Sequence, residues 1–140
     1  MTEPTWQALF TGKYLASADL GDREPTVKIE RIEVETVEDE KRGPRERWIM
    51  YVANGRKGIL LNRTNCVLIA RICKTDTPKE WIGHQITFGV RDVPFGGEIV
   101  KGLRVVGSPE LTAPMDVTIK LPKKKPQVVT LQPTGKGTSR

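Results

Sequence analysis

The sequence has little of what most catalytic and metal sites are built from. Among its 140 residues there are only two cysteines and one histidine, His84. His84 has no cysteine or carboxylate at metal-ligand spacing, and Cys66 and Cys73 do not form a zinc pattern. The GxxxxGK[ST] loop, the GxSxG elbow and a carboxylate pair in an apolar setting are missing as well. The sequence therefore predicts no metal and no other cofactor, and it argues against an enzyme.

Long apolar runs are missing too. No stretch approaches the roughly 20 apolar residues that cross a bilayer, and the start, Met-Thr-Glu-Pro, lacks both the basic and the apolar part of a signal peptide. Cys66 and Cys73 lie in a segment that reads as helix, where they would be about 10 Å apart, too far for a disulfide. We therefore expect a cytoplasmic protein that has no membrane partner and keeps both cysteines as buried thiols.

The positive charge is concentrated toward the end of the chain. The formal net charge is +6, and from Gly107 onward six cations stand against two anions, which leaves only +2 for residues 1–106. A compact cluster lies between two prolines: Lys123, Lys124 and Lys125. Such a cluster can bind phosphates non-specifically, although solvated lysines near a terminus are also common. The abundance of Pro, Thr, Lys and Gly predicts that residues 108–140 form a basic, largely flexible tail.

The clearest local signal is Asn54-Gly55, a dipeptide favoured in two-residue type I′ hairpin turns. Strand-forming residues flank it on both sides. A two-residue loop sets the register, so that Met50 opposes Ile59 and Tyr51 opposes Gly58. One face of the hairpin is then apolar and belongs to the core: Trp48, Met50, Val52, Ile59 and Leu61. The other face holds Arg47, Ile49, Tyr51, Ala53, Arg56, Gly58 and Leu60.

That second face is the candidate binding surface. Tyr51 lies opposite a glycine, which leaves its ring accessible to stack on a base, while Arg47 and Arg56 bracket it and can hold phosphates. The alternative is that the N-terminal segment half-buries this face and that Tyr51 merely packs there. The candidate nucleic-acid-binding residues are this tyrosine, nearby cations, two residues of the last hairpin and the lysine cluster: Arg45, Arg47, Tyr51, Arg56, Lys57, Phe95, Lys101, Lys123, Lys124 and Lys125.

Apolar spacing predicts the other elements. The strand over 26–37 changes face near Arg31, as at a β-bulge. A helix over 66–73 has Asn62 or Thr64 as its N-cap, a second capping turn follows around Pro78, and two more strands come after it.

Three strands, a helix and a closing hairpin are the element order of an OB-type barrel. We therefore predict an all-β fold with one or two short helices, a five-stranded OB-type barrel whose helix lies between strands 3 and 4. Its parts are an N-terminal arm or short helix packed on the barrel (1–24), the barrel (25–107) and the basic tail (108–140).

Several motifs resemble those of a group of small phage and prophage proteins. Residues 13–20 match a Lys-Tyr-Leu-x-x-x-Asp-Leu opening, residues 57–65 are Lys-Gly-Ile-Leu-Leu-Asn-Arg-Thr-Asn, and Trp81-Ile82-Gly83 precedes the fourth strand. The resemblance covers roughly residues 13–106 and implies an OB fold and a role in phage DNA replication or recombination. It supplies no functional residues. The usual bacterial single-stranded DNA binder ends in an acidic tail that recruits partners, whereas this chain ends basic.

Together these observations favour a protein that binds single-stranded nucleic acid, DNA before RNA, without strong sequence preference. Phage replication or recombination proteins are further candidate partners, and self-association is left open. The alternative is a protein-binding or virion-structural module with the same fold and no nucleic-acid activity. Binding of a labelled oligonucleotide separates the two.

Overall fold

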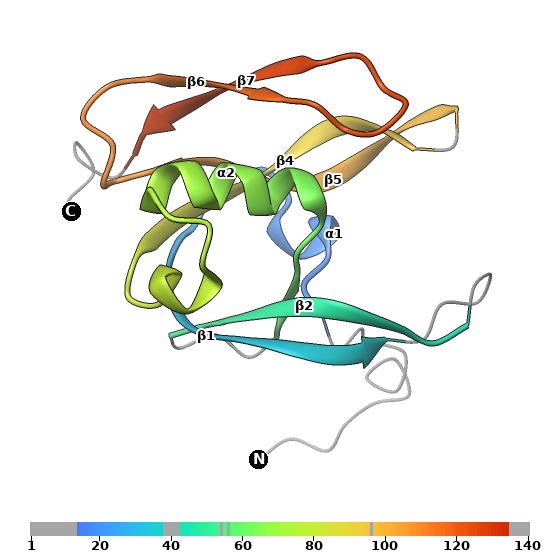
Figure 1. Ribbon diagram of the computed structural model, residues 1–140, viewed down its shortest axis with the longest axis horizontal. Helices are drawn as coiled ribbons and strands as arrows, with labels where there is room; N and C mark the ends of the chain where they lie inside the picture. The colour runs from blue at the N-terminus through green and yellow to red at the C-terminus, as the bar shows by residue number, and fades with distance from the viewer. Residues whose placement is uncertain (1–13, 38–42, 54, 56, 96, 135–140) are drawn as a thin grey trace.

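Seven strands hydrogen-bond into one open sheet in the computed structural model of the protein (Figure 1). The structure describes residues 14–37, 43–53, 55, 57–95 and 97–134. Its elements are α1 (Ser17–Leu20), β1 (Thr26–Val37), β2 (Arg45–Val52), β3 (Ile59–Leu60), α2 (Arg63–Cys73), η2 (Pro78–Trp81), β4 (Gln85–Phe95), β5 (Glu98–Ser108), β6 (Met115–Ile119) and β7 (Gln127–Pro133). The strand order is β3-β2-β1-β4-β5-β7-β6. The prediction of a mostly β fold with one or two short helices is confirmed.

A bulge in β1 lets this strand serve two neighbours. The register with β2 shifts between Ile29 and Arg31. Before the shift, Thr26 to Lys28 pair with β4, and after it the strand continues along β2. The predicted bulge near Arg31 is thus confirmed, and it bends the sheet so that β1 and β2 lie below α2 in Figure 1 while β4 and β5 lie behind it.

The register predicted for the hairpin of β2 and β3 is confirmed over the two pairs that the strands form. The predicted type I′ turn is wrong, because the φ of Gly55 is not positive and its N–H donates to the Val52 carbonyl at 3.0 Å. Met50 pairs with Ile59, and the next pair along follows the same register. Trp48, however, is 45% exposed, and its cross-strand neighbour Val34 is 48% exposed. The prediction that Trp48 belongs to the core is therefore wrong, because Trp48 lies in an open groove between β2, α2 and η2.

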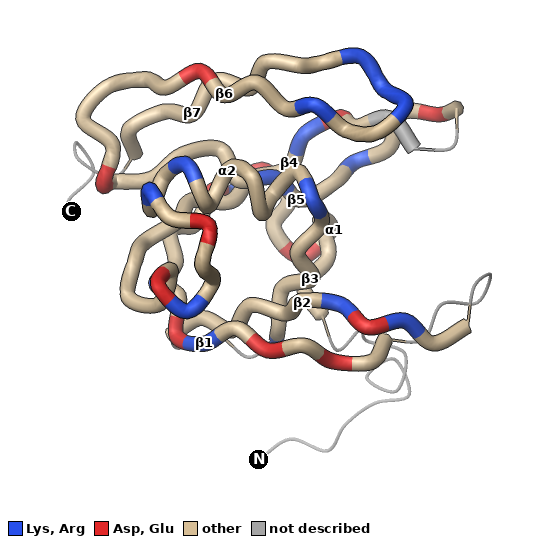
Figure 2. The backbone as a smooth tube through the Cα atoms, viewed as in Figure 1, with Lys and Arg blue, Asp and Glu red and all other residues tan. Residues whose placement is uncertain are grey.

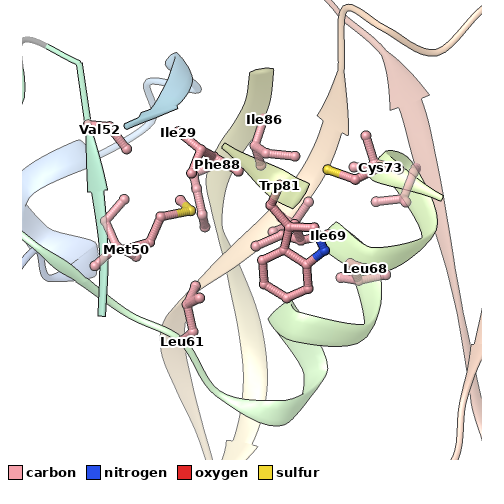
Figure 3. Packing of buried hydrophobic residues seen from close by; sticks show 14 of the residues in the cluster. Ile29, Met50, Val52, Leu61, Leu68, Ile69, Cys73, Trp81, Ile86 and Phe88 are labelled. Atoms are coloured by element: carbon pink, nitrogen blue, oxygen red, sulfur yellow. The ribbon is translucent and has the colours of Figure 1, made fainter. Parts of the chain in front are cut away.

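Helix α2 fills the centre of the core. The Asn62 side chain accepts a hydrogen bond from the Asn65 N–H at 2.8 Å, so Asn62 is the N-cap. Leu68 and Ile69 are fully buried against the sheet, where Phe88 is also buried (Figure 3). No helix in the described ranges is both long and apolar enough to cross a membrane.

The predicted five-stranded barrel is wrong. The pairing of β3, β2, β1, β4 and β5 is what such a barrel would show if it were cut open, but no ladder joins β3 to β5 in the described part of the chain. The physical reason is that β3 has only two residues before Asn62 caps α2. We call the gap between β3 and β5 the seam.

The N-terminal segment occupies one side of the seam. The Leu15 N–H donates to the Gly58 carbonyl at 2.8 Å, next to β3, and the Ser17 hydroxyl donates to the Lys101 carbonyl of β5 at 3.4 Å. α1 is only four residues long, and residues 1–13 of the predicted arm lie outside the described residues. Residues 15–17 thus bridge β3 and β5, the two strands that a closed barrel would pair directly.

A single side chain bonds to the β5 edge of the seam from inside. Asn65 is 1% exposed; its amide donates to the Leu103 carbonyl at 3.1 Å and accepts from the Val105 N–H at 3.0 Å. These are the two backbone groups that a neighbouring strand would engage. Asn65 therefore takes the place of a strand partner for β5.

The prediction that residues 108–140 form a largely flexible tail is wrong for most of that range. β6 and β7 form an antiparallel hairpin whose Val117, Ile119 and Leu131 are buried. β7 also pairs in parallel with the end of β5. This contact needs a glycine, because a Cβ atom on Gly107 would lie 2.0 Å from the Gln132 carbonyl oxygen. Only residues 135–140 of the predicted tail lie outside the described residues.

Candidate nucleic-acid interface

Tyr51 lies on the predicted face, but its ring is already engaged. The Arg31 guanidinium carbon is 3.8 Å from the ring centroid, and the phenol donates to the Glu35 carboxylate. Tyr14 donates to the other oxygen of that carboxylate at 3.0 Å. On the neighbouring strand, a Cβ atom added to Gly58 would lie 3.0 Å from the Tyr51 ring. The N-terminal segment thus reaches this face and half-buries Tyr51, as in the alternative interpretation of the sequence.

This cluster has a testable effect on tyrosine ionisation. The hydrogen bond to Glu35, with burial, raises the pKa of Tyr51 from 10.0 to about 12, and burial with the same carboxylate raises the pKa of Tyr14. Because the folded pKa lies above the unfolded value, this stabilisation is present below pH 10 and is lost as the pH rises through about 12. We expect the tyrosinate absorbance of the folded protein to stay low near pH 10, while the urea-unfolded chain titrates there. Ordinary titration of both tyrosines in the folded protein would contradict the cluster.

The same face carries acidic residues from β1. Glu33 and Glu35 are the cross-strand neighbours of Ile49 and Arg47. Neighbours directly opposite in an antiparallel pair point to one side of the sheet. Two carboxylates therefore offset the arginines on the Tyr51 face, and this face attracts phosphates less strongly than the sequence suggested.

The seam gathers cations that the sequence did not place side by side. A cleft of about 340 Å³ lies between residues 15–17, the β2–β3 hairpin and β5. Its lining includes Arg47, Lys101 and Arg104. Arg47 and Lys101 were predicted as binding residues from strands far apart in the sequence, and the structure brings them to one cleft. Arg104 was not predicted.

Arg104 carries a charge that no carboxylate of the described residues neutralises. It is half-buried, and burial lowers its pKa. Its guanidinium donates to the carbonyl of Leu103 at 3.2 Å, and it takes part in none of the ion pairs found among the described residues. Lys101, in contrast, pairs with Asp92 at 2.6 Å in an exposed setting. Because a partly buried charge without a counter-ion is costly, an anion placed next to Arg104 would be favourable.

Arg104 also lines a second cavity, of about 440 Å³, beneath the β6–β7 hairpin. The predicted residue Lys124 lines it from the hairpin, and valines and Leu121 supply apolar side chains. Asp92 lines it too, but its carboxylate is paired with Lys101. Figure 2 shows Lys and Arg along the end of the β6–β7 hairpin and on β2, on the same side of the molecule. We give the name cation track to four residues of the two cavities: Arg47 and Lys101 line the seam cleft, Lys124 lines the larger cavity, and Arg104 lines both.

Comparison with known proteins does not choose between the Tyr51 face and the cation track. No family model, curated protein or solved structure matches this chain. The choice therefore depends on the geometry and the charges described above, which favour the cation track.

Three predicted residues of the β2–β3 region lie apart from the track. Lys57 forms an ion pair with Asp19 at 3.2 Å. Arg45 is exposed at the start of β2. Arg56 lies outside the described residues. Of the predicted cations in this region, Arg47 is the one that lines the seam cleft.

The other predicted residues lie near the hairpin ends. Lys123 and Lys125 are exposed in the turn between β6 and β7, on either side of Lys124. Phe95 is the last residue of β4, and its backbone pairs with Glu98. The lysine cluster therefore belongs to the turn of the β6–β7 hairpin, and Lys124 of this turn lines the larger cavity.

The two thiols are buried or half-buried, and the histidine lies beside a carboxylate. Burial raises the pKa of Cys73 to about 12, and burial raises the pKa of Cys66 although Arg47 opposes the shift. Both thiols are free, and at neutral pH they are protonated and poorly nucleophilic. His84 Nδ1 lies 2.6 Å from the Glu110 carboxylate, and no three His, Cys, Asp or Glu side chains in the described ranges could hold a metal ion together.

Proposed function

We propose that this protein binds single-stranded nucleic acid, DNA in preference to RNA, along the cation track. The observation that carries the proposal is Arg104, a half-buried guanidinium without a carboxylate partner in the described chain, located where the two cavities meet. A phosphate beside it would supply the missing counter-ion. Arg47 and Lys101 on one side and Lys124 on the other would hold neighbouring phosphates.

The shape of the track favours a single strand over a duplex. Both cavities are recesses between elements rather than a broad convex surface, and the larger one has apolar walls that include Val106 and Val129. A single strand can turn its bases toward such walls while its phosphates meet the cations, and contacts of this kind are sequence-tolerant. A duplex keeps its bases paired and stacked, so it would reach only the rim.

The resemblance of residues 13–106 to small phage and prophage proteins indicates in which process this activity would be used. We propose that the protein acts in phage-type DNA replication or recombination, in the cytoplasm of a bacterial host. Its role there is to bind and not to catalyse. Replication or recombination proteins of the same phage would be its protein partners.

Fluorescence anisotropy with a labelled oligo-dT at two salt concentrations tests the proposal. Each neutralised phosphate contributes a slope of about −0.7 to the plot of log affinity against log salt, so a track of four cations predicts a slope of roughly −2 to −3. A duplex of the same length should bind more weakly at each salt concentration. If oligo-dT does not bind at low salt, the proposal is wrong.

A protein-binding or virion-structural module remains the second candidate, because a separate observation favours it. Trp48 and Val34 are neighbouring, half-exposed apolar side chains away from the cation track. Stable oligomers in light scattering, together with no oligonucleotide binding, would favour this second function.

A further inference from the structure

Trp48 lines an apolar groove on the other side of β2 from Arg47. The groove has a volume of about 400 Å³ and lies between β2, α2 and η2. Its apolar lining comes from all three elements: Trp48, Cys66, Val67, Ala70, Pro78 and Trp81. Trp81 is buried and forms part of the floor, whereas Trp48 stands half-exposed at the side. Figure 3 shows Trp81 packed beside Leu68 and Ile69 of α2.

The exposed tryptophan is the first sign that something binds here. Trp48 and its cross-strand neighbour Val34 are 45% and 48% exposed, next to a recess that can take a side chain. Tryptophan is strongly enriched among the residues that dominate binding energy at protein interfaces. A lone exposed valine would need no explanation, but a tryptophan, a valine and a recess together do.

The charges around the groove indicate what kind of partner fits. Arg63 and Arg71 lie four residues before and after Val67, so these three residues form one ridge along α2 beside the groove. Lys74 follows at the end of the helix. Arg63, Arg71 and Lys74 are exposed, and none of them takes part in the ion pairs found in the described part of the chain. The helix side of the groove is therefore basic.

The groove itself is not suited to a nucleic-acid backbone. Asp76 lines it, and its carboxylate would repel any anion on the apolar floor, a phosphate or a peptide carboxylate alike, so a ligand's anions must lie outside the floor. The cations lie on the helix ridge and not within the groove. This pattern suits a ligand with an apolar side chain in the middle and carboxylates toward α2.

We propose that this groove binds a short acidic peptide segment of a partner protein, which inserts an aromatic or leucine side chain between Trp48 and Val67 and directs its carboxylates toward Arg63 and Arg71. The groove shares no lining residue with the two cavities of the cation track. The same chain could thus hold nucleic acid on one surface and a partner protein on another.

A random peptide library displayed on phage, selected against the full chain and counter-selected against the Trp48→Ala variant, tests the proposal. We expect enriched peptides to carry a net negative charge and at least one aromatic or leucine residue. Synthetic versions should bind with an affinity that falls as salt rises. Failure to enrich any peptide, or enrichment of basic peptides, would overturn the proposal.

Variants then locate the bound peptide. Trp48→Ala should weaken binding at least tenfold, and Arg71→Glu, whose exposed position spares the fold, should weaken it severalfold. Ile99→Ala is the matched control, because Ile99 is 68% exposed on β5 and lines neither the groove nor the two cavities of the cation track, and it should leave the affinity unchanged. Equal loss with the control variant would overturn the site.

Oligo-dT binding of the same variants distinguishes this proposal from the proposed function. Trp48→Ala should bind oligo-dT as the unaltered protein does. If it loses oligo-dT binding instead, the groove takes part in nucleic-acid binding and the peptide site is wrong. If oligo-dT does not bind at all but the acidic peptides do, the proposed function fails and the peptide site stands.

Discussion

Arg104→Gln should weaken oligo-dT binding by about 1.5–2.5 kcal/mol at low salt, which corresponds to a ten- to seventyfold rise in Kd. The reason is that Arg104 is the track cation that lines both cavities, where it is half-buried and has no carboxylate partner among the described residues. Its loss removes a charge-assisted hydrogen bond to phosphate. The salt slope should become shallower by about 0.7. Arg104→Lys, which keeps the charge, should recover part of the loss.

The same substitution should not destabilise the fold. Burial lowers the pKa of Arg104, which means that the folded protein holds the charged guanidinium at a cost. We therefore expect the free energy of unfolding in urea to change little for Arg104→Gln, because the Leu103 carbonyl that loses the Arg104 bond still accepts from Asn65. Arg71→Gln makes the same change of charge on the exposed side of α2 and serves as the control for binding. If both variants weaken oligo-dT binding equally, binding reflects net charge and not the track.

Asn65→Ala should lower the free energy of unfolding by about 1–3 kcal/mol. Its amide bonds both the Leu103 carbonyl and the Val105 N–H. Without this amide, the buried Val105 N–H loses its bond to Asn65, at a cost of about 1–3 kcal/mol, while the Leu103 carbonyl still accepts a hydrogen bond from Arg104. Urea denaturation followed by circular dichroism measures the loss.

Asn62→Ala is the matched control for this prediction. Asn62 caps the same helix but does not bond to β5, and loss of an N-cap costs about 1 kcal/mol. A destabilisation by Asn65→Ala no larger than that of Asn62→Ala would show that the seam does not depend on this side chain. Asn65→Asp keeps an acceptor for Val105 but loses the donor to Leu103, so its stability should be low as well.

Local features of the fold could be predicted from the sequence because local chemistry determines them. The Asn54-Gly55 dipeptide predicts where the chain reverses, and the observed pairing of Met50 with Ile59 agrees with that position although the type I′ turn itself does not form. The step in apolar spacing near Arg31 marks a bulge, and the residues before Cys66 contain an N-cap. Each of these depends on residues a few positions apart.

Barrel closure and the C-terminal hairpin could not be predicted, because they depend on contacts between distant residues. Whether β3 pairs with β5 is decided by the early start of α2 and by Asn65, which bonds to β5 from across the core. The β6–β7 hairpin shows only a short alternation around Val117, and its contact with β5 depends on the close approach at Gly107.

The candidate site was predicted in part for the same reason. Arg47 and Lys101 could be chosen as exposed cations on strands, and they do line one cleft. The engagement of Tyr51 by Glu35 required the register of β1 against β2. Arg104 differs in no visible way from other strand arginines, and its importance comes from burial beside the seam.

Photo-crosslinking of a 4-thiothymidine oligonucleotide, followed by mass spectrometry, tests most directly whether single strands follow the seam. The account predicts crosslinked peptides from residues 100–106 of β5 and from residues 121–130 of the β6–β7 hairpin, where the two cavities lie. High salt should suppress these crosslinks. Crosslinks confined to the Tyr51 face or to the Trp48 groove, or no crosslinks at low salt, would contradict it.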